Sequence, residues 1–156
     1  MYLVFIILFF CSCSHKKQDD NFAYTYMKGI SVIEEYGSRV CTDWNVAIDM
    51  ETLGLFCDAA DYLESLTGIE YHYTYVDIPI YESNYAVQQD VQYLKRWFEK
   101  YGKTMTKDDA DIIVGKEYEN CKSNPPNIDS VIVKWERKMQ ERDGAKKRSH
   151  ETKTQL

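Results

Sequence analysis

The chain has 156 residues, which is enough for one domain and too few for two ordinary ones. Its 44% hydrophobic and 28% charged residues are typical of a folded protein, and its seven glycines and three prolines exclude collagen-like and low-complexity architectures. The formal net charge is −6, but residues 18–132 carry nine basic and 21 acidic side chains, whereas residues 134–156 carry eight basic and four acidic ones. The acidic body argues against nucleic-acid binding, because lysine and arginine supply the phosphate contacts.

The N-terminal segment begins with an eight-residue apolar run, Leu3 to Phe10. As a helix this run reaches about 12 Å, whereas a membrane-spanning helix needs about 20 residues to cross a core of about 30 Å. The run matches the apolar region of a secretory signal, although only the α-amino group supplies positive charge ahead of it. The alternative is a buried strand or helix with two core cysteines, but the sequence turns abruptly polar from Ser14.

The residues Phe10-Cys11-Ser12-Cys13 resemble the lipobox of bacterial lipoproteins, with two small residues ahead of a cysteine and phenylalanine in place of the usual leucine. The resemblance implies that residues 1–12 are a signal peptide and that Cys13 carries the lipid. It also implies a lipidated tether over residues 13–21. Because Ser14 follows the cysteine instead of aspartate, the resemblance implies the outer membrane, on its periplasmic or surface face.

Two segments show firm helical periodicity. In residues 51–67 the apolar positions recur every three or four residues, and Gly68 can adopt the positive φ that ends a helix. Residues 85–101 repeat the pattern and stop before Gly102. The sequence therefore predicts two amphipathic helices whose apolar stripes are Leu53, Phe56, Ala60, Leu63 and Leu66 in the first, and Val87, Val91, Leu94, Phe98 and Tyr101 in the second.

The remaining segments are less regular. Residues 22–36 have helical spacing, with a strand around residues 30–33 as the alternative, and Gly37-Ser38 is predicted to end the segment. A third helix is expected from Thr106 and a last one from Asp129-Ser130, followed by a disordered basic tail over residues 143–156. We therefore expect one mostly α domain at residues 22–142, with about four helices and a short extended or hairpin Tyr-rich segment; an α+β fold is the alternative.

Tyrosine is the unusual feature of the composition, with 13 residues in all. In residues 69–81 tyrosine alternates with other side chains at the period of a strand, and Pro79 ends that strand or keeps it at an edge. Exposed tyrosines are enriched where proteins bind partners, whereas the alternative is that these rings cover the helices as core and edge. The predicted partner-binding residues are Tyr71, Tyr73, Tyr75, Tyr81 and Tyr85.

Few residues suggest chemistry. Of the three histidines only His72 falls inside the predicted domain, and Asp58 and Asp61 share a helix face at a spacing that could bracket a sugar or a metal. The Gly-rich, zinc and nucleophile-elbow motifs are missing, so we predict neither a metal nor a cofactor. The five cysteines show no CxxC pair, and a disulfide among Cys41, Cys57 and Cys121 stays open.

Two classes of function follow. The first is a non-enzymatic binding lipoprotein of the cell envelope, whose partner is a protein or a glycan; one form is an immunity protein whose acidic face meets a basic toxin. The second is an envelope hydrolase or glycan-processing enzyme that uses Asp58, Asp61 and His72. The oligomeric state does not follow from the sequence.

Overall fold

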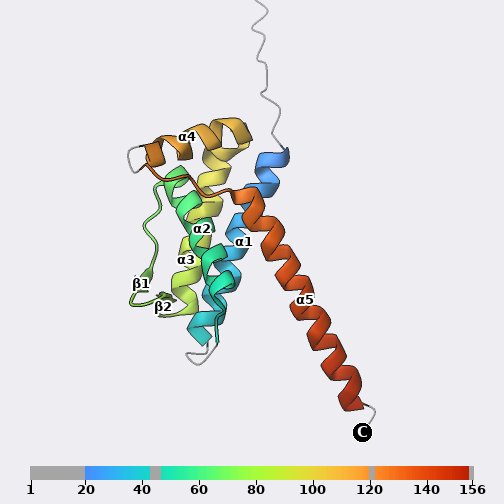
Figure 1. Cartoon of the computed structure of the whole chain (residues 1–156). Helices are drawn as coiled ribbons and strands as arrows, with labels where there is room; N and C mark the ends of the chain where they lie inside the picture. The colour runs from blue at the N-terminus through green and yellow to red at the C-terminus, as the bar shows by residue number, and fades with distance from the viewer. Residues whose placement is uncertain (1–19, 43–46, 120–121, 155–156) are drawn as a thin grey trace, which may run out of the picture.

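The computed structural model describes residues 20–42, 47–119 and 122–154 (Figure 1). This part of the chain forms five α-helices, one short 3-10 helix and one two-stranded antiparallel hairpin, which confirms the predicted mostly helical class. The predicted signal peptide, Cys13 and Cys121 lie outside the described residues. The elements are α1 (Asp20–Thr42), α2 (Met50–Thr67), β1 (Tyr73–Tyr75), β2 (Pro79–Tyr81), α3 (Asn84–Lys100), η1 (Gly102–Thr104), α4 (Lys107–Glu119) and α5 (Ile128–Thr154).

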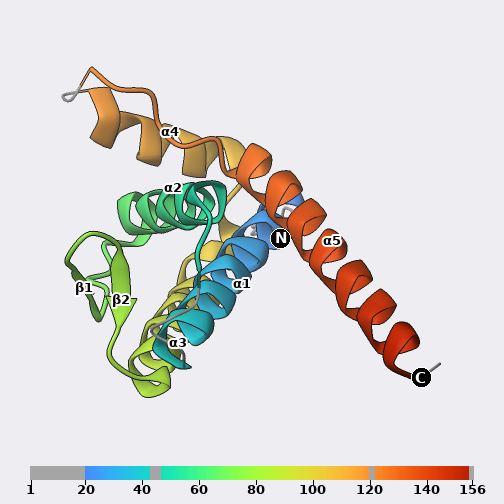
Figure 2. The ribbon, with the colours of Figure 1, turned by 60° about the horizontal axis from the view of Figure 1, so that its bottom comes forward.

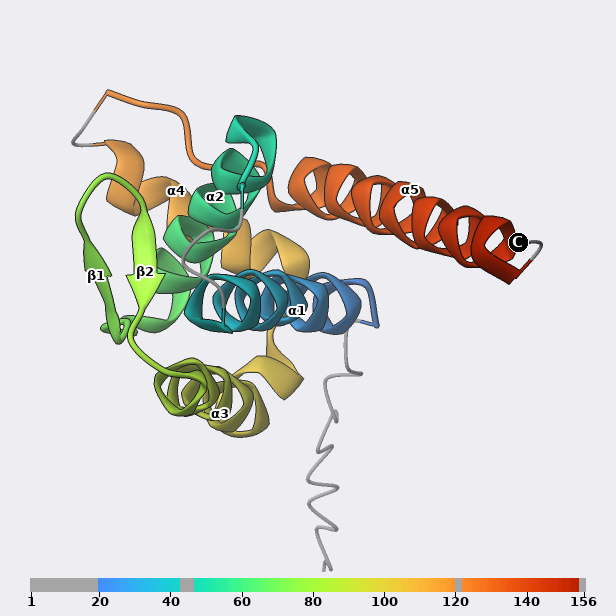
Figure 3. The same ribbon diagram turned by 90° about the horizontal axis from the view of Figure 1, so that it is seen from below.

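Helix α1 lies at the centre and packs against α2, α3 and α5 (Figures 2 and 3). It starts at Asp20, inside the predicted tether, and is helical throughout, so the strand alternative is wrong. Its apolar residues recur every three or four positions and are buried against the neighbouring helices. These buried residues are Phe22, Tyr26, Ile30, Ile33, Tyr36 and Val40.

The two firm helices form as predicted, and each begins at a side-chain cap. Asp49 caps α2 by accepting a hydrogen bond from the backbone N–H of Thr52 at 2.9 Å, and Gly68 ends it at φ 68°. The Ser83 hydroxyl caps α3 by accepting from the N–H of Ala86 at 3.2 Å. Both predicted stripes are buried apart from their ends, where Leu53 is only partly buried and Tyr101 is exposed.

Gly37 does not end the first helix, contrary to the prediction. A β-carbon at this position would lie 2.8 Å from Cγ2 of Val87 and 3.0 Å from the ring of Tyr81. The glycine therefore lets α1 approach α3 and β2 closely, and the helix continues past it to Thr42.

The C-terminal helix differs from the prediction at both ends. Asn127, not Asp129 or Ser130, caps it, because the Asn127 side chain accepts from the N–H of Ser130 at 3.0 Å and the helix begins at Ile128. It then continues to Thr154, whereas the sequence predicts disorder after Arg142. Residues 143–154 contain no proline, and their three lysines, together with Ala145, Arg148 and Glu151, have high intrinsic helix propensity.

The hairpin lies beside the C-terminal half of α1, away from α4 (Figure 1). Its register pairs Tyr73 with Tyr81 and Tyr75 with Pro79. Pro79 is the first residue of β2 in a sheet that has only edge strands, which is a position that tolerates the missing N–H. The Tyr36 hydroxyl donates to the Pro79 carbonyl at 3.3 Å and so links the hairpin to α1.

Candidate functional site

The hairpin divides the predicted partner-binding tyrosines into two groups. Tyr81 is fully buried and Tyr71 and Tyr73 are partly buried, whereas Tyr75 is 66% exposed and Tyr85 is 72% exposed. Tyr81 belongs to the core because β2 lies against α1, and a partner does not reach its ring in this conformation. Of these five tyrosines, only Tyr75 and Tyr85 leave most of their side-chain surface accessible to a partner.

The inward rings form one aromatic cluster on α2. Tyr73 contacts Tyr81 edge-on at 5.5 Å and Phe56 at 5.7 Å between ring centroids, and it stacks on Tyr71 at 5.2 Å. The Tyr71 hydroxyl donates to the Ala60 carbonyl at 3.2 Å. Burial raises the pKa of the hydroxyls of Tyr71, Tyr73 and Tyr81, so all three remain neutral at physiological pH. The cluster fixes the hairpin on the domain.

The outward residues surround the turn of the hairpin. Val76 is 74% exposed and follows Tyr75 directly, and Asp77 adds an exposed carboxylate. The Tyr75 hydroxyl lies 3.6 Å from Sγ of Cys57, and its ring meets that of Tyr73 edge-on at 6.2 Å between centroids, while most of the side chain stays exposed. We call Tyr75, Val76 and Asp77 the hairpin tip.

A buried carboxylate holds the start of the hairpin against α3. Asp90 is 1% exposed, and its Oδ2 accepts a hydrogen bond from the backbone N–H of His72 at 3.0 Å, while its Oδ1 lies 2.5 Å from Nδ1 of the same residue. The His72 side chain is 54% exposed and lines a cavity of about 250 Å³ together with Glu70 and Tyr93. The pair anchors the hairpin and orients the imidazole ring.

The sequence prediction missed Asp90. The available signal was its position: an aspartate three residues after Val87 and one before Val91, on the buried stripe of α3. A carboxylate on an apolar stripe is stable only with a partner, because burying an unpaired charge is costly. The pattern therefore pointed to a buried partner, but it did not identify His72.

Asp61 lines a larger cavity, of about 630 Å³, between α2 and the end of α4. Three glutamates also line it: Glu64, Glu70 and Glu117. Burial raises the pKa of Asp61, with a further contribution from Asp58, and burial together with Asp61 raises the pKa of Glu64. His72 and Asp90 line the smaller cavity instead, so the predicted grouping of Asp58, Asp61 and His72 does not share one cavity.

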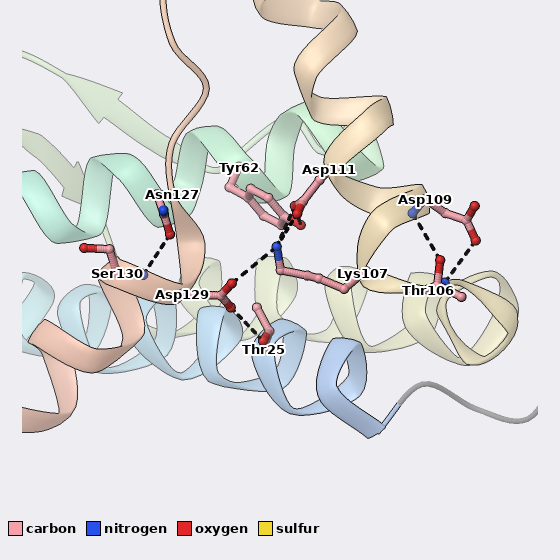
Figure 4. A network of polar contacts seen from close by, with 9 residues as sticks. All are labelled: Thr25, Tyr62, Thr106, Lys107, Asp109, Asp111, Asn127, Asp129 and Ser130. Atoms are coloured by element: carbon pink, nitrogen blue, oxygen red, sulfur yellow. Dashed lines mark hydrogen bonds and ion pairs between the residues drawn. The ribbon is translucent and has the colours of Figure 1, made fainter.

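A polar network joins α4 to three other helices (Figure 4). Lys107 Nζ lies 2.5 Å from Oδ2 of Asp111 and 3.5 Å from Oδ2 of Asp129, and its side chain is 15% exposed. Asp111 also accepts from the hydroxyl of Tyr62 on α2 at 3.1 Å, and Asp129 accepts from that of Thr25 on α1 at 3.1 Å. Each charged group has a partner, which is the arrangement of a structural ion-pair network.

The two described cysteines, Cys41 and Cys57, are free thiols. Burial raises the pKa of Cys57, and Asp58 and Asp61 also raise it, so its thiol is protonated near neutral pH. Cys57 is partly buried and packs against the hydrophobic core.

No family model, curated protein or solved structure matches the chain. Within the described ranges, no group of three or more histidine, cysteine, aspartate or glutamate side chains is placed to hold a metal ion. None of the helices formed by residues 20–42, 47–119 and 122–154 combines the length and apolarity needed to cross a membrane.

Proposed function

We propose that this chain is a lipid-anchored, non-enzymatic protein of the cell envelope that binds a basic protein through the hairpin tip and Tyr85. The observation that carries the proposal is the fixed position of the tip. Tyr71, Tyr73 and Tyr81 hold the hairpin on the core, while Tyr75 and Val76 extend into solvent.

A rigid aromatic residue is an effective binding anchor, because little conformational entropy is lost when the partner covers it. The His72–Asp90 contacts add to this rigidity by joining the hairpin to α3. An exposed tyrosine beside an exposed valine also offers apolar area with a hydroxyl for hydrogen bonding. These features suit a protein partner better than a small ligand, since neither cavity described above is lined by the tip residues.

The charge of the domain suggests the sign of the partner. Residues 18–132 carry a net charge of −12, and Asp77 and Glu82 are exposed on either side of β2. Such a field favours encounter with a basic surface and repels acidic ones. One form of the proposal is an immunity protein that covers the basic cleft of a toxin; a glycan partner is the other binding outcome.

The anchor is proposed at Cys13, from the likeness of residues 10–13 to a lipobox. Several acyl chains on one cysteine hold a protein firmly on a membrane, because each buried methylene contributes about 0.8 kcal/mol. The outer membrane is the proposed location. Replacement of the anchor residue, Cys13→Ala, is expected to abolish metabolic labelling with a fatty acid, and persistent labelling would show that another residue carries the lipid.

Photo-cross-linking in native cells tests the binding proposal. A benzophenone amino acid placed at Tyr75 is expected to capture one basic protein, whereas the same probe at Val133, which is 68% exposed on α5, is expected to capture none. The complex should weaken as salt rises, because the attraction is screened beyond about 8 Å at physiological ionic strength. Equal adducts at both positions, or a partner that carries net negative charge, would contradict the proposal.

The enzymatic alternative is favoured by one observation, the buried Asp90 that orients the His72 ring. Against it, Asp61 and His72 line two neighbouring cavities instead of one, and the group that contacts the His72 ring is the carboxylate of Asp90, not a hydroxyl or thiol nucleophile. Hydrolysis of envelope glycans that is lost in His72→Gln but retained in the Tyr75→Ala variant would favour this alternative over binding.

A further inference from the structure

Three elements meet at the end of the molecule where α1 begins (Figure 1). Thr25, in the second turn of α1, and Lys107, the first residue of α4, both contact Asp129. Phe22 lies 6.0 Å from Phe98 between ring centroids, which places the last turn of α3 beside the first turn of α1. We call the end formed by the start of α1, the end of α3 and the whole of α4 the anchor end.

Exposed apolar side chains are present at the anchor end. On α4, Ala110 and Val114 are buried, whereas Ile112 is 57% exposed and Ile113 is 36% exposed. Tyr101, directly after α3, is 48% exposed, and Lys100 Nζ lies 4.8 Å above the centre of its ring. Exposed isoleucine, tyrosine and lysine are residue types that proteins place at a membrane interface.

The proposed lipid site brings this end close to a membrane. Six residues lie between Cys13 and Asp20, and an extended chain over these seven steps spans about 25 Å at most. Helix α1 has 23 residues and is therefore about 35 Å long, and the hairpin packs near its far end, beside Tyr36 and Gly37. The anchor end is held near the lipid, and the hairpin lies at a distance from it.

We propose that the anchor end rests on the lipid surface, with Ile112 and Ile113 of α4 in the interfacial layer and Tyr101 at its edge. This inference rests on the proposed lipidation of Cys13. The lipid anchor supplies the affinity, and the isoleucines select which end of the domain faces the membrane. Asp108 and Asp109 of α4 repel anionic lipid headgroups. The proposed contact of α4 is therefore with the apolar part of the bilayer interface, and it does not depend on charged lipids.

Tryptophan quenching by brominated lipid tests the orientation. The full lipidated chain is reconstituted in phosphatidylcholine vesicles with either ordinary or brominated acyl chains, and it carries Ile112→Trp or, as the matched control, Val76→Trp at the hairpin tip. Both positions are largely exposed, so neither substitution alters the core. The three native tryptophans are present in every sample, and the emission of the unsubstituted chain is subtracted.

We expect the added emission of Ile112→Trp to fall by about half or more in brominated vesicles, because its ring lies at acyl-chain depth. The added emission of Val76→Trp should stay the same. Flotation of the vesicles separates two failures. Protein that floats without quenching at position 112 overturns the proposed orientation alone and indicates a tether that keeps the domain off the membrane. Protein that does not float overturns the lipid anchor and this inference with it.

Discussion

The tyrosines of the hairpin and those beside it differ in what surrounds them, although the sequence presents them as one cluster. Tyr81 is fully buried between α1 and the inward rings, whereas Tyr75 and Tyr85 are mostly exposed. The first kind contributes to folding, and the second is available to a partner. Tyrosines within 15 positions of one another therefore serve two purposes, and the place of each in the fold decides whether its ring is buried or exposed.

Strand alternation alone does not produce this division. Tyr71, Tyr73 and Tyr75 are spaced two residues apart and should point to the same side of the strand. Tyr73 packs on Phe56 of α2, whereas Tyr75 contacts the neighbouring Cys57 only through its hydroxyl and meets the ring of Tyr73 edge-on. Side chains on the same face of the strand are therefore buried to different extents, because the core covers Tyr73 and leaves most of Tyr75 in solvent.

The largest expected effect tests the inward group. Tyr81→Ala removes a fully buried ring and should lower the free energy of unfolding by about 3–5 kcal/mol. Tyr85→Ala, the matched control, should change it by less than about 0.5 kcal/mol, because the side chain is exposed. Urea unfolding measures both, and equal losses would show that the two groups are not distinct.

The second largest expected effect comes from a substitution at Asp90, whose contacts with His72 join the hairpin to α3. Asp90→Asn replaces a buried carboxylate that receives the N–H of His72, and we expect a loss of about 1–3 kcal/mol. Amide hydrogen exchange should accelerate in the hairpin more than in α2. The control is Asp58→Asn, whose side chain is exposed; uniform acceleration over the whole chain in Asp90→Asn would contradict a local anchor.

A smaller loss of stability is expected from a substitution at Gly37, where α1 contacts Tyr81 of the inward group. Gly37→Ala places a methyl group 2.8 Å from Val87, and we expect a loss of about 1–2 kcal/mol after the helix propensity of alanine is counted. Gly54→Ala on α2 has nothing within 4 Å of the added carbon and should stabilise the protein by up to about 1 kcal/mol. Thermal unfolding compares them, and a stabilised Gly37→Ala would refute the close approach.

A pH titration tests the same comparison, and its effect on stability is absent at neutral pH and appears only at alkaline pH. Burial raises the pKa of Tyr36 to about 12 and that of Tyr81 further, so folding holds both protonated. Their contribution to stability is fully present below the unfolded tyrosine pKa of about 10 and is lost as pH rises above it. Tyr81→Phe should reduce this alkaline loss, as measured by urea unfolding at stepwise pH, and an unchanged pH dependence would contradict the assignment.

The sequence predicted the elements whose signals are local. Helices α2 and α3 have apolar stripes, side-chain caps at Asp49 and Ser83, and a terminating Gly68, and all of these signals lie within the segments themselves. Gly37 was misread because its role depends on Val87, 50 positions away in the sequence. A glycine that ends a helix and one that permits close packing look the same until the partner helix is known.

The candidate site was less predictable for the same reason. The alternation of tyrosines indicated a strand, but which rings are covered depends on how the hairpin packs against α1 and α2. Asp90 carried a detectable signal on its stripe, whereas its pairing with His72 is a tertiary contact. The separation of Asp61 from His72 into two cavities likewise depends on packing, not on spacing in the sequence.

The most direct test of the account is the yield of photo-cross-linked partner at position 77 in native cells, compared between the native tip and the double variant Tyr75→Ala/Tyr85→Ala. The photo-cross-linking amino acid replaces Asp77 in both proteins, so the two differ only in the rings of Tyr75 and Tyr85. The account predicts about a tenfold lower yield in the double variant, since exposed aromatic anchors dominate binding energy. An unchanged yield from a stably folded variant would contradict the central claim that these outward tyrosines bind the partner.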